Sequence, residues 1–432
     1  MQEMLTTKKN VFFKFAAFHS FLIGLLPFFI PVLLWQQGFE LWQLSFFIAL
    51  TGLGFLLALP LWENLYFNNL WDKIIRTSFI LEAILFTTVL FIEVLPLTAS
   101  LFLVALLNGA YLCFYWTSQR TLFTQLEHAQ SDEEENGATN SSTTTGNNFG
   151  NFQIVVMVLL KVGILLSAFL LEQGLDTLLL GLSLVIAMIG VFSLSTNSIA
   201  EYIPEHITEL RSKKNESSLD KPTRIVFYLD GIFLYLESYF WLLSLYLIAQ
   251  QDLMQLGFLV VGLTLLLAGL FWLIKGRIDA ASANNIFQLA IAGYAISWIL
   301  RGVLGFDGSS LIAAPEISYP LILLIAFLTS FFRLSFNKRF FDHATLLNSN
   351  QTTMIQYLLD KSTLSQFGIF VFFSVLGIAL LSLSMSSSLS PSITAINGQL
   401  SWIYMAAAPL VLLYGFYSQP LENTQGRPSC IR

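Results

Sequence analysis

Residues 224–251, RIVFYLDGIFLYLESYFWLLSLYLIAQQ, form an apolar run long enough to cross a lipid bilayer, because about 20 helical residues span its hydrocarbon core. Within this run Asp230 and Glu237 are seven residues apart, which places both carboxylates on one face of a helix. A carboxylate near the bilayer centre costs roughly 2.5–3.5 kcal/mol on insertion scales, so it normally faces the protein interior or a water-filled cavity. The run therefore predicts a membrane-spanning helix with a polar, inward-facing side.

Composition places the whole chain in the same class. Its 432 residues are 55% hydrophobic and only 11% charged, whereas soluble globular domains are about 25% charged. Cys113 and Cys430 are too few for a disulfide framework or a metal site. The sequence has no P-loop, nucleophile elbow or glycine-rich dinucleotide motif. We therefore expect an all-α membrane protein that is not an enzyme and does not use ATP, with no cofactor, no nucleic acid, and a small-molecule solute and membrane lipid as partners.

Twelve apolar runs have the length of a membrane span. They occupy residues 12–35, 41–62, 76–95, 98–118, 152–172, 175–198, 225–249, 253–274, 282–304, 317–336, 363–386 and 400–418. The runs form two sets of six around a polar, basic stretch. This pattern predicts an N-terminal six-helix half at 1–198, a cytoplasmic linker at 199–223, and a C-terminal six-helix half at 224–432.

The distribution of positive charge predicts the orientation. Cytoplasmic loops of membrane proteins are enriched in lysine and arginine, and an even number of spans puts both termini on one face. That face carries all 21 lysines and arginines except Lys161, inside the fifth span, and Arg301, on the far side. Both termini are therefore predicted to be cytoplasmic, in a multi-pass protein of the cytoplasmic (inner) membrane. Two long loops, 128–150 and 340–361, are expected on the same face.

The two halves resemble each other in sequence. The pair Gln36-Gln37 recurs as Gln250-Gln251. In the fourth span Tyr111, Tyr115 and Gln119 recur every four residues and make one polar stripe. A shift of 218 residues gives a matching stripe in the tenth span, made of Thr329, Arg333 and Asn337. Six-helix halves in the same orientation are parallel repeats, related by an axis along the membrane normal.

These features resemble the major facilitator superfamily. The loop between its second and third spans follows G-x-L-A-D-R-x-G-R-K, and residues 68–77 of this chain read NNLWDKIIRT, which keeps the leucine, the acid and two bases but neither glycine. The resemblance implies two halves that rock about a central site, a cavity lined by spans one, four, seven and ten, and a monomer. It also implies that Asp72, Lys73 and Arg76 form a charge latch between the halves on the cytoplasmic side.

Two charges deep in the spans are the first candidates for chemistry. Lys161 could attract an anionic solute or make a structural ion pair between helices. Glu237 could bind a proton or solute, since a buried carboxylate readily becomes neutral, or it could be fixed structurally by Lys161 or by a tyrosine. Asp230 could assist in proton coupling or brace the cytoplasmic end of the span.

The remaining candidates have weaker signals. His19 in the first span could titrate near neutral pH or be a packing residue, and Glu82 in the third is expected to pair with Arg76. Arg333 could face the cavity or extend towards the cytoplasmic interface. Trp116 could line a cavity or anchor at the membrane interface. As cavity-lining or solute-binding residues we therefore predict Lys161, Glu237, Tyr111, Tyr115, Arg333, Thr329 and His19.

Together these features predict a secondary transporter of a small solute, anionic or zwitterionic, that works by alternating access and is coupled to an ion or to protons through Glu237 and Asp230. The alternative is a membrane protein of the same fold that does not transport and acts as a sensor or assembly partner. The two readings differ at Lys161 and Glu237, which only a transporter needs.

Overall fold

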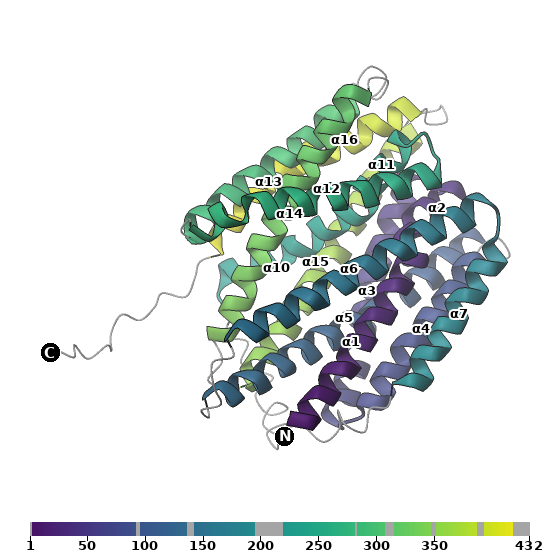
Figure 1. The fold of residues 1–432 in the computed structure, drawn as a ribbon. Coiled ribbons are helices and arrows are strands. Elements are labelled where there is room, and N and C mark those ends of the chain that lie inside the picture. The colour runs from purple at the N-terminus through teal and green to yellow at the C-terminus, as the bar shows by residue number, and fades with distance from the viewer. Residues whose placement is uncertain are drawn as a thin grey trace.

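The computed structural model describes residues 2–91, 96–135, 142–194, 219–280, 283–306, 315–346, 351–386 and 393–417, and every regular element in them is helical (Figure 1). Among these residues, ten helical segments are long and apolar enough to cross a membrane. The chain is thus a multi-pass helical membrane protein, as its composition predicts.

The helices up to α7 correspond to the first six predicted spans. They are α1 Gln2–Leu25, η1 Pro27–Phe29 and α2 Ile30–Gln36, which together make the first span, then α3 Leu41–Phe67, α4 Trp71–Leu90, α5 Leu97–Glu135, α6 Ser142–Glu172 and α7 Asp176–Ser193. The break in the first span falls at Pro27 and Pro31, because proline lacks the N–H that would continue an α-helix.

The helices from α10 on correspond to the other six predicted spans. They are α10 Lys221–Tyr235, η3 Leu236–Trp241 and α11 Leu242–Ile248, which together make the seventh span, then α12 Leu253–Ala280, α13 Ala283–Phe306, α14 Pro315–Leu346, α15 Gln351–Ser386, α16 Ile393–Val411 and η4 Leu412–Phe416. The seventh span begins at Lys221, within the predicted linker, most of which lies outside the described residues.

Two of the twelve predicted spans, α4 and α6, are helical but are not among the ten apolar segments. α4 is shifted towards the chain start relative to the predicted span at 76–95 and includes Asp72, Lys73, Arg76 and Glu82. In α6 the side chains are described only from Val156 on. That all twelve cross the membrane therefore stays a prediction.

The predicted long loops are wrong in extent, because helices continue into them. α5 continues to Glu135 and α6 begins at Ser142, so most of 128–150 is helical. Likewise α14 continues to Leu346 and α15 begins at Gln351, inside the predicted loop at 340–361. A polar composition ends a membrane span without ending a helix, and in 128–135 glutamate, glutamine and alanine favour the helix; helix propensity does not explain the helical 142–150, which is rich in threonine, asparagine and glycine.

The same pairs of helices pack together in both parts of the chain. α1 packs on α6, α4 on α7 and α4 on α5; correspondingly, α10 packs on α15, α13 on α16 and α13 on α14. Figure 1 shows the helices up to α7 on one side and those from α10 on the other, and the two sides meet where α3 contacts α15 and α6 contacts α12. This pattern agrees with the predicted repeat. Below, the first half means the helices up to α7 and the second half those from α10.

Glycine brings helices into close contact within each half. A Cβ on Gly163 of α6 would lie 2.5 Å from the carbonyl oxygen of Phe21 in α1. A Cβ on Gly368 of α15 would lie 2.7 Å from the carbonyl oxygen of Tyr228 in α10. Small residues let helix backbones approach within a membrane, so Gly368 allows α10 and α15 the close approach at which Asp230 and Lys361 meet, and Gly163 does the same for α1 and α6.

Candidate functional site

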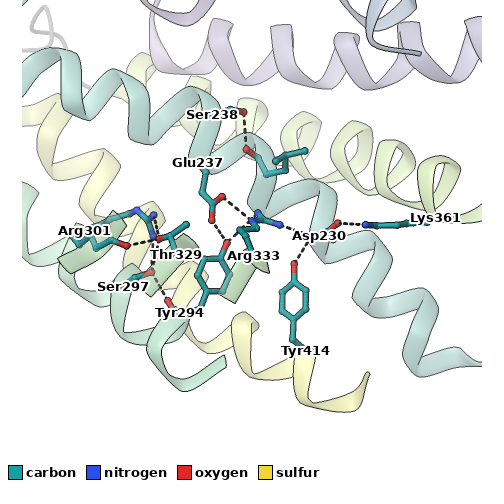
Figure 2. Close-up of polar contacts among 12 residues, drawn as sticks. Asp230, Glu237, Ser238, Tyr294, Ser297, Arg301, Thr329, Arg333, Lys361 and Tyr414 are labelled. Atoms are coloured by element: carbon teal, nitrogen blue, oxygen red, sulfur yellow. Dashed lines mark hydrogen bonds and ion pairs between the residues drawn. The ribbon is translucent and has the colours of Figure 1, made fainter. Parts of the chain in front are cut away.

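Four charged side chains from different parts of the second half meet in its interior, and we call them the charge cluster: Asp230, Glu237, Arg333 and Lys361 (Figure 2). Arg333 of α14 bridges the two carboxylates, with its Nη1 2.6 Å from Asp230 Oδ1 and its Nε 3.1 Å from Glu237 Oε2. Lys361 Nζ of α15 lies 3.2 Å from Asp230 Oδ2. Arg333 is the most exposed of the four side chains, at only 18%, so little solvent weakens these ion pairs.

Two tyrosines complete the contacts of the carboxylates. The Tyr294 hydroxyl of α13 donates a short hydrogen bond to Glu237 Oε1. The Tyr414 hydroxyl of η4 donates to Asp230 Oδ1 at 3.4 Å. Each carboxylate is thus held by one tyrosine and by Arg333, and Asp230 also by Lys361.

Glu237 lies where the seventh span is irregular. Residues Leu236–Trp241 form a π-helical turn between α10 and α11. Such turns occur mostly as single insertions in α-helices and are frequent at functional sites. Despite the change of spacing, Asp230 and Glu237 reach the same arginine, as their placement on one helical face predicts.

Arg301 is buried within a helical segment, four residues from its end at Gly305; that this end lies on the far side of the membrane stays a prediction. It belongs to α13 and is 2% exposed. Its Nη1 donates to Ser297 Oγ at 3.0 Å, and its Nη2 donates to Thr329 Oγ1 at 2.7 Å (Figure 2). Its guanidinium also contacts the rings of Trp298 and Trp241, at 4.4 and 5.0 Å from their centroids. Thr329, a predicted cavity residue, is therefore a partner of this arginine.

A second polar cluster lies inside the first half, around His19 of α1. His19 Nδ1 is 2.7 Å from Glu82 Oε2 of α4, and both side chains are fully buried. His19 Nε2 is 3.1 Å from Ser78 Oγ, and the imidazole stacks on Phe79 at a centroid distance of 4.0 Å. Glu82 therefore pairs with His19; the expected partner, Arg76, instead pairs with Asp72 one helical turn away at 3.0 Å.

The predicted tyrosines of the fourth span pack around this second cluster. Tyr115 lies 4.5 Å from the His19 ring, and Tyr111 stacks on Tyr115. Both tyrosines are buried, whereas Trp116 is 38% exposed, which fits its interpretation as a surface anchor. A shift of 218 residues carries His19 onto Glu237 and Tyr115 onto Arg333, so the clusters occupy matching spans of the two halves.

Lys161 is not brought to the charge cluster. It is half-buried in α6, and no acidic group of the described residues lies within ion-pair distance of it. Of the two structural partners considered for Glu237, a tyrosine is present and Lys161 is not. Asp72 and Arg76 pair within α4, and Lys73 is exposed, so a latch that joins the halves through them stays a prediction.

Polar contacts join the two halves at several depths. Gln36 of α2 donates to the Tyr246 hydroxyl at 2.8 Å, near the turns that carry the repeated glutamine pairs. Asn108 of α5 donates to the Tyr239 hydroxyl at 3.1 Å. At the opposite end, Arg120 Nη1 of α5 donates to Ser362 Oγ of α15 at 3.2 Å.

Sequence reasoning missed five polar residues of these sites: Tyr294, Arg301, Lys361, Tyr414 and Arg120. The sequence assigned Lys361 and Arg120 to the cytoplasmic face and gave them no partners, whereas in the structure Lys361 is 6% exposed and pairs with Asp230, and Arg120 contacts Ser362. Arg301 lies only three residues inside the predicted end of the ninth span, where an arginine can extend to the interface, so the sequence carried no signal that it is buried.

The chain matches no protein-family model and no curated protein sequence. In structure it is similar to the crystal structure of nucleoside transporter NupG, with 14% identical residues, a TM-score of 0.60, and coverage of 96% of this chain and 98% of that chain. It is also similar to the crystal structure of D-xylose-proton symporter, with 12% identity, a TM-score of 0.57, and coverage of 96% and 97%. Identities this low establish a common fold and leave the chemistry of the site open. The chain thus has the fold of the major facilitator superfamily, as its sequence predicts.

Proposed function

We propose that the protein is a secondary transporter that carries a small anionic or zwitterionic solute across the cytoplasmic membrane by alternating access, coupled to protons. The charge cluster is the observation that supports this proposal. Each ionised side chain at the membrane centre costs roughly 2.5–3.5 kcal/mol on insertion scales, so such residues mark solute, ion or proton pathways. The similar structures are those of a nucleoside transporter and a D-xylose-proton symporter, which carry small polar solutes.

Glu237 is the proposed proton-binding group. Its carboxylate contacts Arg333 and Tyr294, and it also interacts electrostatically with Arg301. A proton on Glu237 removes its ion pair with Arg333, whereas Asp230 keeps Arg333 and also keeps Lys361. Proton uptake therefore loosens α14 from the seventh span at one end of the cluster, which is the kind of local change that can bias a two-state element.

The contacts between the halves support alternating access. α3 and α15 contact each other, as do α6 and α12, and these pairs can act as the surfaces on which the halves rock. The polar contact Gln36–Tyr246 lies beside the turns that end α2 and α11, whereas Arg120–Ser362 joins α5 to α15 away from those turns. In a rocking cycle each opens in turn. With both termini cytoplasmic, the Arg120–Ser362 contact is the cytoplasmic one.

The proposal is tested with the purified full chain. A thermal-shift screen of amino acids, sugars, organic acids and nucleosides identifies the solute, because a ligand that binds only the folded protein raises the melting temperature. Uptake of that solute into proteoliposomes is then measured with and without an imposed pH gradient. The expected result is uphill uptake that Glu237→Gln abolishes while leaving downhill exchange.

Two outcomes would refute this function. If no solute of any class is taken up by folded protein, the non-transporting alternative is favoured. If Glu237→Gln retains uphill uptake with unchanged pH dependence, proton coupling through Glu237 is wrong even though transport stands.

A further inference from the structure

We propose that Arg301 is the binding site for a carboxylate of the transported solute. This inference rests on the proposed function and adds to it the chemical class of the solute and the residue that recognises it. The charge cluster itself is not the anion site, because both of its cations are already occupied by its own carboxylates.

Arg301 is a buried cation that no carboxylate of the described residues neutralises directly. Its partners are two hydroxyls, those of Ser297 and Thr329, and two indole rings. Among the described residues no acidic oxygen lies within ion-pair distance of its guanidinium, and its Nε–H has no hydrogen-bond acceptor. A buried donor without an acceptor costs about 1–3 kcal/mol, and more for a charged group. An anionic acceptor on the solute would remove this cost, which would favour binding of the solute.

The charges around Arg301 also require an anion. Asp230 and Glu237 interact electrostatically with four cations, which are Arg120, Arg301, Arg333 and Lys361. Positive charge therefore exceeds negative charge among these groups when both carboxylates are ionised. Arg301 contributes one positive charge that its hydroxyl and indole partners do not neutralise. A carboxylate brings one negative charge, whereas a phosphate ester brings about two at neutral pH, so a carboxylate matches the single charge of Arg301.

The surroundings of Arg301 suit such a group. Arg301 lines a pocket between η3, α11, α13 and α16 together with Trp241, Ser244, Asn397 and Tyr404. The pocket has a volume of about 10 Å³, room for about one water molecule, so a solute reaches Arg301 only when these helices separate. A guanidinium presents a planar fork of N–H donors that matches the two oxygens of a carboxylate. The indole of Trp241 and the phenol of Tyr404 offer an apolar wall to the body of the solute, and Asn397 and Ser244 offer polar groups beside it.

Anion binding at Arg301 is expected to cooperate with proton binding. Protonation of Glu237 removes a negative charge that interacts with Arg301, which strengthens the attraction of Arg301 for a carboxylate. By linkage, a bound carboxylate strengthens proton binding by the same factor. The arrangement therefore fits cotransport of a proton with a carboxylate in the same direction.

The test measures binding of three carboxylates, lactate, benzoate and nicotinate, each against its neutral amide of nearly the same shape, by thermal shift of the purified full chain. At least one carboxylate is expected to raise the melting temperature where its amide does not. Arg301→Gln should weaken that binding at least tenfold, and Arg301→Lys, which keeps the charge without the fork, should weaken it less. Arg76→Gln is the matched control, because it removes an arginine from an exposed ion pair and should leave binding unchanged.

Failure of this inference is distinguishable from failure of the proposed function. The inference is overturned if no carboxylate binds more tightly than its amide, or if Arg301→Gln, monodisperse on gel filtration, binds the carboxylate within twofold of the parent. Should Arg301→Gln not fold, the comparison of Arg301→Lys with the parent decides, and equal affinity contradicts recognition by the fork. If the protein takes up an uncharged solute and Arg301→Gln leaves this uptake unchanged, the proposed transport function stands and only the carboxylate site is refuted.

Discussion

Replacing Arg333 with glutamine removes the residue that connects the two carboxylates of the charge cluster. Its guanidinium lies 2.6 Å from Asp230 Oδ1 and 3.1 Å from Glu237 Oε2. Hydrogen bonds to charged groups contribute about 1.5–3 kcal/mol each, and removal of one partner from a buried ion pair costs about 3–5 kcal/mol. Asp230 keeps Lys361 and Glu237 keeps Tyr294. We therefore expect Arg333→Gln to lower the free energy of unfolding by about 3–4 kcal/mol, the lower part of that range.

The double variant separates this explanation from a loss of packing. If the cost arises because Glu237 is left as a buried unpaired charge, then Arg333→Gln with Glu237→Gln should recover about 1.5–3 kcal/mol of it. The assay is reversible denaturant unfolding in mixed micelles, followed by tryptophan fluorescence. The control is Arg76→Gln, whose exposed pair with Asp72 predicts a change below about 1 kcal/mol. A loss as small as the control's, or strictly additive costs in the double variant, would refute the ion-pair account.

Two further predictions concern the first half. His19→Ala leaves Glu82 buried without its ion-pair partner and should lower the free energy of unfolding by about 3–5 kcal/mol. Adding Glu82→Gln should restore part of the lost free energy. No restoration would mean that the histidine stabilises the protein by packing alone. Gly163→Leu puts a side chain against the Phe21 carbonyl of α1 and should prevent monodisperse folding in detergent, whereas Gly181→Leu, at a position with nothing within 4 Å, should fold normally; equal behaviour of the two would contradict the close contact of α1 and α6.

The positions of the helices follow closely from the sequence, because hydrophobic runs of spanning length are a strong and local signal. The span predicted at 225–249 is observed from Lys221 to Ile248, and the one at 41–62 is contained in Leu41–Phe67. The helix ends were less predictable. The polar segment 128–135 continues the helix α5 beyond its apolar part, and hydropathy marks the end of the apolar part but not the end of the helix.

The partners of the charged residues could be predicted only in part. The spacing of Asp230 and Glu237 indicated a shared face, and the repeated stripe indicated Arg333. The burial and partners of Lys361 and Arg301 were missed because each lies near the end of an apolar run, where charge signals an interface, and because their partners come from other helices. Such pairings depend on how the helices pack against each other, which hydropathy and residue spacing do not reveal.

The most direct test of alternating access measures distances across both faces of the protein with paired spin labels. In a variant with Cys113→Ser and Cys430→Ser, one pair of labels replaces the exposed Gln37 and Gln250 at the Gln36–Tyr246 end, and another replaces the exposed Asn68 and Lys338 at the opposite end. A rocking transporter predicts two populations of label-to-label distance at each face. Between pH 8 and pH 5 the distance at one face should lengthen as the distance at the other shortens. In Glu237→Gln both distances should stay near their low-pH values. A single distribution at both faces that neither pH nor Glu237→Gln alters would contradict the account.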